Sequence, residues 1–432
     1  MNLMQNRFIK NTSWLLLGRI IQMIIQFVVG VFSARYLGPE NYGTINYVAS
    51  FLSFFTSLCG LGLNGVIINE FINHKDEEGQ ILGTAILMRF AVSLLSVFSF
   101  IFLVYLLDGR NESVILWVAV LQAVQLPFAA FDTVNYWYQS KLLSKYASIF
   151  QTVAYSLVAA YKIILLITRQ SIYWFAFSSS LDIILLSVLY YVGYQKHKTQ
   201  KLDFSKDTAK RILKNCYPFI LANLMIFIYS QTDRIMIKQM LDSTVLVGFY
   251  SASAVITTII SFIPTSFIDS ARPVIMESKS DAEQYQLRLR QTVAFVSWIS
   301  FLYGVFIVIF ARFVVLLLYG NAFLEAVPCL RIMVWADAFS FIGGIRSIWL
   351  ICEKKNNYVW ILSAIGALTN VILNLILIPL WGVNGAAFAT LMTQLLSNVV
   401  YPLLFKDTRG FSKVALQGIF LRRVGIVKIF LQ

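Results

Sequence analysis

The chain has 432 residues, of which 58% are hydrophobic and 13% are charged, and its formal net charge is +14 at pH 7. This apolar content exceeds that of soluble globular proteins, so it excludes a soluble enzyme and predicts a chain that crosses a membrane many times. The Lys and Arg residues are spread over polar loops and form no folded basic domain, so we expect no nucleic-acid partner.

Twelve apolar segments long enough to span a bilayer follow one another along the chain, since one crossing takes roughly 20 apolar residues. Proline interrupts three of them, at Pro127, Pro218 and Pro264, where the helices are expected to bend. We expect helices at about 12–35, 43–67, 81–107, 113–138, 146–168, 172–194, 215–240, 245–270, 291–318, 327–352, 357–380 and 383–405.

A polar, Lys-rich segment lies between the sixth and seventh expected helices and divides them six and six. The predicted fold is an all-α polytopic membrane protein with about 12 transmembrane helices in two repeated six-helix bundles. Its expected parts are an N-terminal six-helix bundle (1–194), a cytoplasmic linker (195–214), a C-terminal six-helix bundle (215–405) and a basic cytoplasmic amphipathic tail (406–432).

The two halves open with a similar helical hairpin. In the first, Gly38 and Pro39 end a helix, because Pro cannot continue it and disfavours the α region for the residue before. Gly43 then lets the chain turn, and a second apolar run starts at once. The pattern returns at Gly248, followed as before by small and aromatic residues. Internal repeats of this kind are common in transporters.

Loop charges predict the orientation of the chain in the membrane. Lys and Arg gather in the N-terminal segment, in alternate loops and in the C-terminal tail, whereas the opposite loops hold few. Both termini are therefore expected in the cytoplasm. In the tail, apolar residues from Phe411 onward share a helical pattern with Arg422 and Arg423, which predicts a helix lying on an anionic membrane surface.

Polar residues inside the spans are the most informative feature for function. They are costly in lipid and usually face a bundle interior or a water-filled cavity. They form stripes at helical spacing, such as Gln122, Gln125 and Asp132, which favours a polar central cavity. Hydrogen bonding between helices is the alternative explanation. Near the outer end of a span, Lys162 is expected to extend its ammonium toward the interface.

Arginine in such a cavity suits an anionic cargo, because guanidinium pairs with phosphate through two parallel hydrogen bonds, and carboxylates there could carry protons or cations. The candidate substrate-binding residues are Arg19, Gln26, Arg89, Gln125, Arg234 and Arg346. The candidate ion-coupling residues are Asp132, Asp182, Asp233 and Asp337.

Catalytic chemistry and bound metals have little support in the sequence. The four cysteines suit neither a zinc site nor a disulfide framework, and both histidines fall in charged loops. There is no Gly-Lys-Ser/Thr phosphate-binding segment, and the short outer loops lack carboxylates for acting on a sugar donor. We expect no catalytic residue, no metal and no cofactor.

Several segments, taken in order, resemble a known family. The segments 11–19, 34–43 and 60–64 look like the start of Wzx-type polysaccharide flippases, which belong to the MATE/MOP exporter superfamily, and 233–238 and 381–387 extend the likeness. The resemblance implies two six-helix bundles that move an undecaprenyl-pyrophosphate-linked oligosaccharide repeat unit from the inner to the outer leaflet of the bacterial plasma membrane.

The sequence therefore predicts a lipid-linked oligosaccharide flippase for polysaccharide biosynthesis, driven by an ion or proton gradient through alternating access. Arg19, Arg89 and Arg234 would attract pyrophosphate or acidic sugars. Expected partners are the lipid-linked oligosaccharide and membrane lipids, with a polysaccharide polymerase and a chain-length regulator as further candidates. The alternatives are a MATE-like multidrug extruder, a membrane polymerase or ligase, and a scaffold that transports nothing. The product stays open between O-antigen, capsule, exopolysaccharide and a teichoic-type polymer.

Overall fold

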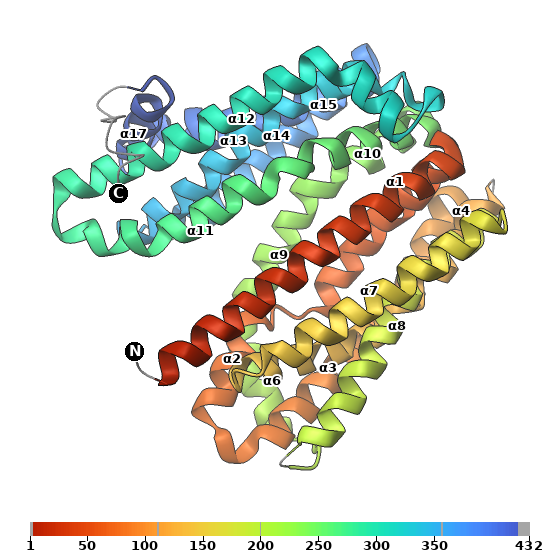
Figure 1. Ribbon diagram of the computed structural model, residues 1–432, viewed down its shortest axis with the longest axis vertical. Helices are drawn as coiled ribbons and strands as arrows, with labels where there is room; N and C mark the ends of the chain where they lie inside the picture. The colour runs from red at the N-terminus through yellow and green to blue at the C-terminus, as the bar shows by residue number, and fades with distance from the viewer. Residues whose placement is uncertain (1–2, 110–111, 199, 356, 422–432) are drawn as a thin grey trace. The chain divides into compact units, whose positions relative to one another are not determined.

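The computed structural model describes residues 3–109, 112–198, 200–355 and 357–421, and within these ranges the regular structure is helical, without strands (Figure 1). Nine stretches of the described chain are long and apolar enough to cross a membrane. They match nine of the twelve expected spans. The other three fall on α1, on the end of α1 with the start of α2, and on α9, so the number of twelve crossings stays a prediction.

The helices of the described chain are α1 (Leu3–Cys59), α2 (Asn64–Asn73), α3 (Glu78–Val104), α4 (Ser113–Ala123), α5 (Gln125–Phe128), α6 (Thr133–Ser140), α7 (Ser144–Ile167), α8 (Ile172–His197), α9 (Lys206–Leu241), α10 (Thr244–Thr258), α11 (Phe262–Glu277), α12 (Ala282–Leu318), α13 (Ala326–Cys352), α14 (Asn357–Trp381), α15 (Val383–Leu395), α16 (Tyr401–Leu404) and α17 (Arg409–Ile419). Short 3-10 or π turns connect them at η1 (Lys75–Glu77), η2 (Tyr105–Gly109), η3 (Ala129–Asp132), η4 (Ile259–Ser261), η5 (Ser278–Ser280), η6 (Asn321–Phe323) and η7 (Leu396–Val400).

Helix breaks lie at Pro127 and just before Pro264, as expected, whereas α9 runs through Pro218 without a break. The fourth expected helix is divided into α4, α5, η3 and α6 around Pro127, because proline removes a backbone donor and clashes with the preceding turn. In α1 the chain kinks at Gly38, whose φ of 71° and ψ of 172° lie in a region that side chains with a Cβ rarely adopt. The break expected at Gly38 and Pro39 is present.

The chain packs into two units. Unit 1 comprises residues 1–37 and 44–227, and unit 2 comprises residues 38–43 and 228–432. The change from one unit to the other falls inside α9, downstream of the segment expected as the linker, and the tip of the first hairpin belongs to unit 2.

Gly43 and Gly248 hold equivalent positions in the sequence repeat, and within unit 2 both lie at one close contact between backbone segments. A Cβ on Gly43 would stand 1.8 Å from the carbonyl oxygen of Thr244, and a Cβ on Gly248 would stand 2.1 Å from the carbonyl oxygen of Pro39. Both atoms are backbone atoms, so only glycine fits at either position.

The expected linker is an integral part of unit 1. Its residues 200–205 run across α3 where Gly79 and Gly83 leave space, since a Cβ there would lie 2.1 Å from the oxygen of Lys201 and 2.3 Å from that of Asp203. The side chain of Gln200 accepts a hydrogen bond from the backbone of Gly79 at 2.8 Å. The segment is therefore packed on α3 rather than free.

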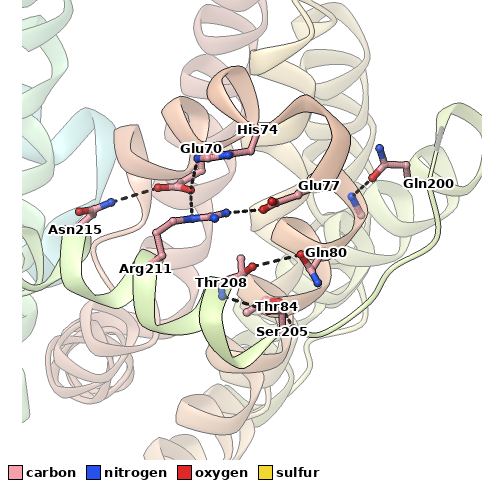
Figure 2. Close-up of polar contacts among 11 residues, drawn as sticks. Glu70, His74, Glu77, Gln80, Thr84, Gln200, Ser205, Thr208, Arg211 and Asn215 are labelled. Atoms are coloured by element: carbon pink, nitrogen blue, oxygen red, sulfur yellow. Dashed lines mark hydrogen bonds and ion pairs between the residues drawn. The ribbon is translucent and has the colours of Figure 1, made fainter.

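Figure 2 shows the polar cluster that continues this attachment onto the first turns of α9. Arg211 donates from Nε to Glu70 at 2.9 Å and from Nη2 to Glu77 at 2.8 Å, and Asn215 donates to Glu70 at 3.2 Å. The hydrogen bond to Glu77 raises the pKa of Arg211 above its ordinary value, so the guanidinium stays charged. Glu70 and Glu77, which are acidic residues among otherwise basic loops, thus pair with Arg211 of the expected linker.

Replacing Arg211 by Met is expected to destabilise unit 1 by about 1–3 kcal/mol, because Glu70 is buried and would lose its charged partner. Thermal unfolding of the detergent-solubilised protein and limited proteolysis of residues 195–206 measure the effect. Lys214→Met, at an exposed position one turn later in α9, is the matched control. Equal unfolding temperatures and equal cleavage rates for the two variants would contradict this account.

The C-terminal segment corrects one expectation. Helix α17 is amphipathic, but its apolar residues Phe411, Val414 and Ala415 are buried in the core of unit 2 with residues of α12 and α13. Gly418 lies so close to Val293 of α12 that a Cβ there would be 2.8 Å from its Cβ. This face is used for packing inside the unit. Residues 422–432, the rest of the expected tail, lie outside the part of the chain that the structure describes.

Candidate functional site

A buried carboxyl group in unit 2 is surrounded by side chains from three other helices. Asp233 of α9 is 4% exposed. The hydroxyl of Thr390 in α15 donates to its Oδ2 at 2.6 Å, and the hydroxyl of Tyr250 in α10 donates to the same oxygen. The amide of Asn374 in α14 donates to Oδ1 at 2.5 Å. Four helices thus meet at this one carboxyl group.

All of these partners are neutral, and among the described residues no Lys or Arg forms an ion pair with Asp233. A carboxylate buried without a counter-charge is costly, so a bound cation beside it would be favourable. Hard cations prefer oxygen ligands, which the carboxyl and hydroxyl groups supply. The buried Oδ1 of Asn374 has no hydrogen-bond partner in the described chain and adds a further oxygen. The cluster can therefore hold a small hard cation.

Two of the candidate arginines are buried and bonded to neighbouring helices. In unit 1, Arg89 of α3 is 6% exposed and donates to the carbonyl oxygen of Cys59 at 3.1 Å and to the hydroxyl of Thr133 at 3.0 Å. In unit 2, Arg346 of α13 is buried and donates to the carbonyl oxygen of Ser397. Both side chains connect helices within their own unit.

Arg234 differs from these two because it is only partly buried. It donates from Nε to Ser251 at 3.1 Å and from Nη1 to Gln231 at 2.6 Å. Its remaining nitrogen has no partner among the described residues, so this guanidinium keeps donors for a ligand. Arg19 lies in α1, but its side chain falls outside the part of the chain that the structure describes.

The other candidates are distributed over both units. In unit 1, Asp132 interacts electrostatically with Arg89, and Gln125 donates to the backbone of Gln122 at 3.0 Å. Gln26 and Asp182 line one cavity. In unit 2, Asp337 lies near the hydroxyl of Thr257, and its Oδ2 is buried without a partner in the described chain.

Sequence reasoning missed two of the three neutral members of the Asp233 cluster, Tyr250 and Thr390. Tyr250 and Thr390 are unremarkable in an apolar span, and nothing in the local pattern assigns them to a carboxyl group. The spacing of Asn370 and Asn374, one helical turn apart, was the available signal; the two amides are hydrogen-bonded at 3.2 Å.

Comparison with known proteins shows that the fold of the chain is similar to that of solved transporters. Its structure is similar to that of the lipid II flippase MurJ in an inward closed conformation (TM-score 0.74, 15% identity, 98% of this chain and 93% of that chain). It is also similar to an inward-facing multidrug resistance MATE family transporter of the MOP superfamily (TM-score 0.70, 13% identity, 94% of this chain and 99% of that chain). These are transporters rather than catalysts.

At the level of sequence, the chain is 23% identical over 412 residues to an uncharacterized membrane protein, MJ1375, of Methanocaldococcus jannaschii, covering 89% of this chain and 95% of the relative. A family model described as "Polysaccharide biosynthesis protein" matches residues 8–279. Nine apolar helices of spanning length lie in the described part of the chain, and the family match covers more than half of its length. The chain is therefore a multi-pass membrane protein that belongs to the polysaccharide biosynthesis protein family.

Proposed function

We propose that the protein is a Wzx-type flippase that moves undecaprenyl-pyrophosphate-linked oligosaccharide repeat units from the inner to the outer leaflet of the bacterial plasma membrane. Two findings support this cargo: the match to the polysaccharide biosynthesis family and the similarity in fold to a protein named as a lipid II flippase. The chain would lie with both termini in the cytoplasm, and its product would pass to a polysaccharide polymerase and a chain-length regulator.

The observation that carries the mechanism is the Asp233 cluster. Asp233 is the candidate carboxyl group that is buried among neutral donors from three other helices, so we assign to it the coupling proton or cation. Binding of the ion would neutralise a charge inside a membrane-spanning unit and change the relative stability of its conformations. An ion gradient can then bias an alternating-access cycle, because a ligand shifts a conformational equilibrium by its difference in affinity for the two states.

Arg234 is the side chain that we assign to the pyrophosphate. It lies next to Asp233 in the chain, is partly exposed and has donors left for a phosphate oxygen. Arg89 is less suited to this role because its buried guanidinium is already bonded to Cys59 and Thr133.

The test uses a host that makes the lipid-linked repeat unit but lacks this gene and any redundant flippase. The lipid-linked oligosaccharide is followed in each leaflet with a membrane-impermeant probe of the sugar. We expect accumulation in the inner leaflet, relieved by the wild-type protein. Arg234→Gln should reduce the rate about 10- to 100-fold, which corresponds to the loss of charged hydrogen bonds worth about 1.5–3 kcal/mol.

The matched control is Arg312→Gln, which makes the same change at an exposed arginine of unit 2. It should restore transport as the wild type does. If re-expression leaves the leaflet distribution unchanged, the flippase proposal fails, and a multidrug extruder becomes the function to test by drug sensitivity. If Arg234→Gln transports at the wild-type rate, the assignment of Arg234 to the pyrophosphate fails.

A further inference from the structure

Unit 1 contains a polar cavity that the coupling site and the arginines do not use. Its volume is about 230 Å³, and it is lined by residues of α1, α7 and α8. The polar lining residues are Gln26, Tyr155, Lys162 and Asp182. Both α7 and α8 are candidate membrane spans, so these groups lie where polar side chains are costly and are usually kept for a function.

The ammonium of Lys162 and the carboxylate of Asp182 in this cavity are not paired with each other. Lys162 and Asp182 attract each other electrostatically, but they form no ion pair or hydrogen bond with one another in the described structure. Oδ1 of Asp182 is buried and has no hydrogen-bond partner among the described residues. A buried acceptor without a partner is unfavourable, and a ligand that donates a hydrogen bond to it would remove this cost. The expected extension of Lys162 toward the interface is therefore not its whole role, since it also lines this cavity.

Charge and size restrict what can bind. One ammonium and one carboxylate give the lining a formal charge of zero, so a neutral ligand fits better than an anion. The ligand must donate to Asp182 and Gln26 and accept from Lys162, which requires hydroxyl groups on more than one side. A pocket for a drug-sized ligand has about 300–1,000 Å³, so this smaller cavity suits a single ring.

We propose that this cavity binds one uncharged pyranose ring of the cargo. Hydroxyl groups of the ring donate to the Asp182 carboxylate and accept from the Lys162 ammonium, and the ring packs beside Tyr155. The proposal rests on the proposed function for the identity of the cargo and adds to it the class of sugar that the protein recognises.

Neighbouring alanines provide a matched pair of variants. Ala159 lines the cavity, whereas Ala160 is exposed on the same helix. Saturation-transfer difference NMR of the full-length protein in nanodiscs, with methyl α-D-glucopyranoside as the probe, reports ring binding without transport. We expect a signal for the wild type and for Ala160→Leu, and its loss in Ala159→Leu, because the larger side chain fills the cavity. No signal for the wild type, or an equal signal in Ala159→Leu, would overturn the proposal.

A second variant, which removes the charge of Asp182, tests whether this side chain recognises the sugar. This test does not depend on whether Ala159→Leu folds. Asp182→Asn keeps the shape of the side chain but gives the lining a net positive charge. The variant should therefore prefer methyl α-D-glucuronide over the glucoside, reversing the wild-type preference by roughly tenfold, or about 1.4 kcal/mol. An unchanged preference would overturn the assignment of Asp182 to the sugar hydroxyls.

The leaflet assay separates the two proposals. A wild-type protein that moves the lipid-linked oligosaccharide but gives no glucoside signal retains the flippase function and refutes the sugar pocket. A protein that gives the signal but leaves the leaflet distribution unchanged keeps the sugar pocket and refutes the flippase.

Discussion

Replacing Asp233 by Asn should abolish gradient-driven transport while the protein stays folded. The amide has nearly the shape of the carboxyl group, and the hydroxyls of Tyr250 and Thr390 can rotate to accept from it, so the packing of four helices is retained. The variant carries no titratable group, so it can neither take up a proton nor offer a charge to a cation. We expect accumulation against a gradient to fall at least about 100-fold, which corresponds to about 2.7 kcal/mol.

Proteoliposomes with a proton gradient or a Na⁺ gradient, imposed one at a time, measure this effect and identify the ion. Thr390→Val, which removes one oxygen from the cluster, should lower uptake about tenfold. Thr258→Val is the matched control, because Thr258 is exposed and its hydroxyl bonds only to the backbone of its own helix. Gradient-driven uptake at the wild-type rate by Asp233→Asn would show that the coupling ion binds elsewhere.

The second large effect is expected at the glycine contact of unit 2. Alanine at Gly43 or at Gly248 places a methyl group 1.8 Å or 2.1 Å from a backbone oxygen, and backbone atoms cannot move aside as a flexible side chain can. Overpacking of this kind typically costs about 1–3 kcal/mol and sometimes more. Because both substitutions disturb one contact, the double variant should lose less than the sum of the two single losses.

Thermal unfolding of the detergent-solubilised variants measures these losses. Gly30→Ala is a control within the same long helix, since a Cβ there meets nothing within 4 Å. It should be neutral or stabilising by up to about 1 kcal/mol, because Ala is the better helix former. A Gly43→Ala variant as stable as Gly30→Ala would refute the close contact.

Features set by neighbouring residues could be predicted from the sequence. The spans follow from local apolar runs of sufficient length, the kink from Gly38 with Pro39, and the equivalence of Gly43 and Gly248 from a pattern that occurs twice. Membrane insertion fixes each span largely by its own composition, so local reasoning is enough.

Contacts between distant parts of the chain could not be predicted. Arg211 bonds to Glu70 across 141 residues, and Thr390 to Asp233 across 157. The charged members of such pairs are visible in a sequence, but their partners are chosen by packing. Arg89 illustrates the limit, because its partners are a backbone oxygen and a neutral hydroxyl, which composition does not mark. For the same reason the sequence pattern of α17 predicts a helix on a membrane surface and does not reveal that its apolar face packs against α12 and α13.

The assignment of residues 38–43 to unit 2 has a consequence for synthesis. The segment leaves the ribosome early, but its partner around Thr244 and Gly248 follows about 200 residues later, which is roughly 10–40 s at 5–20 residues per second. During that interval the hairpin tip lacks its partner, so unit 2 cannot be completed from the second half of the gene alone. A chain divided at the end of unit 1 should yield two fragments that become stable only when both are made in the same cell.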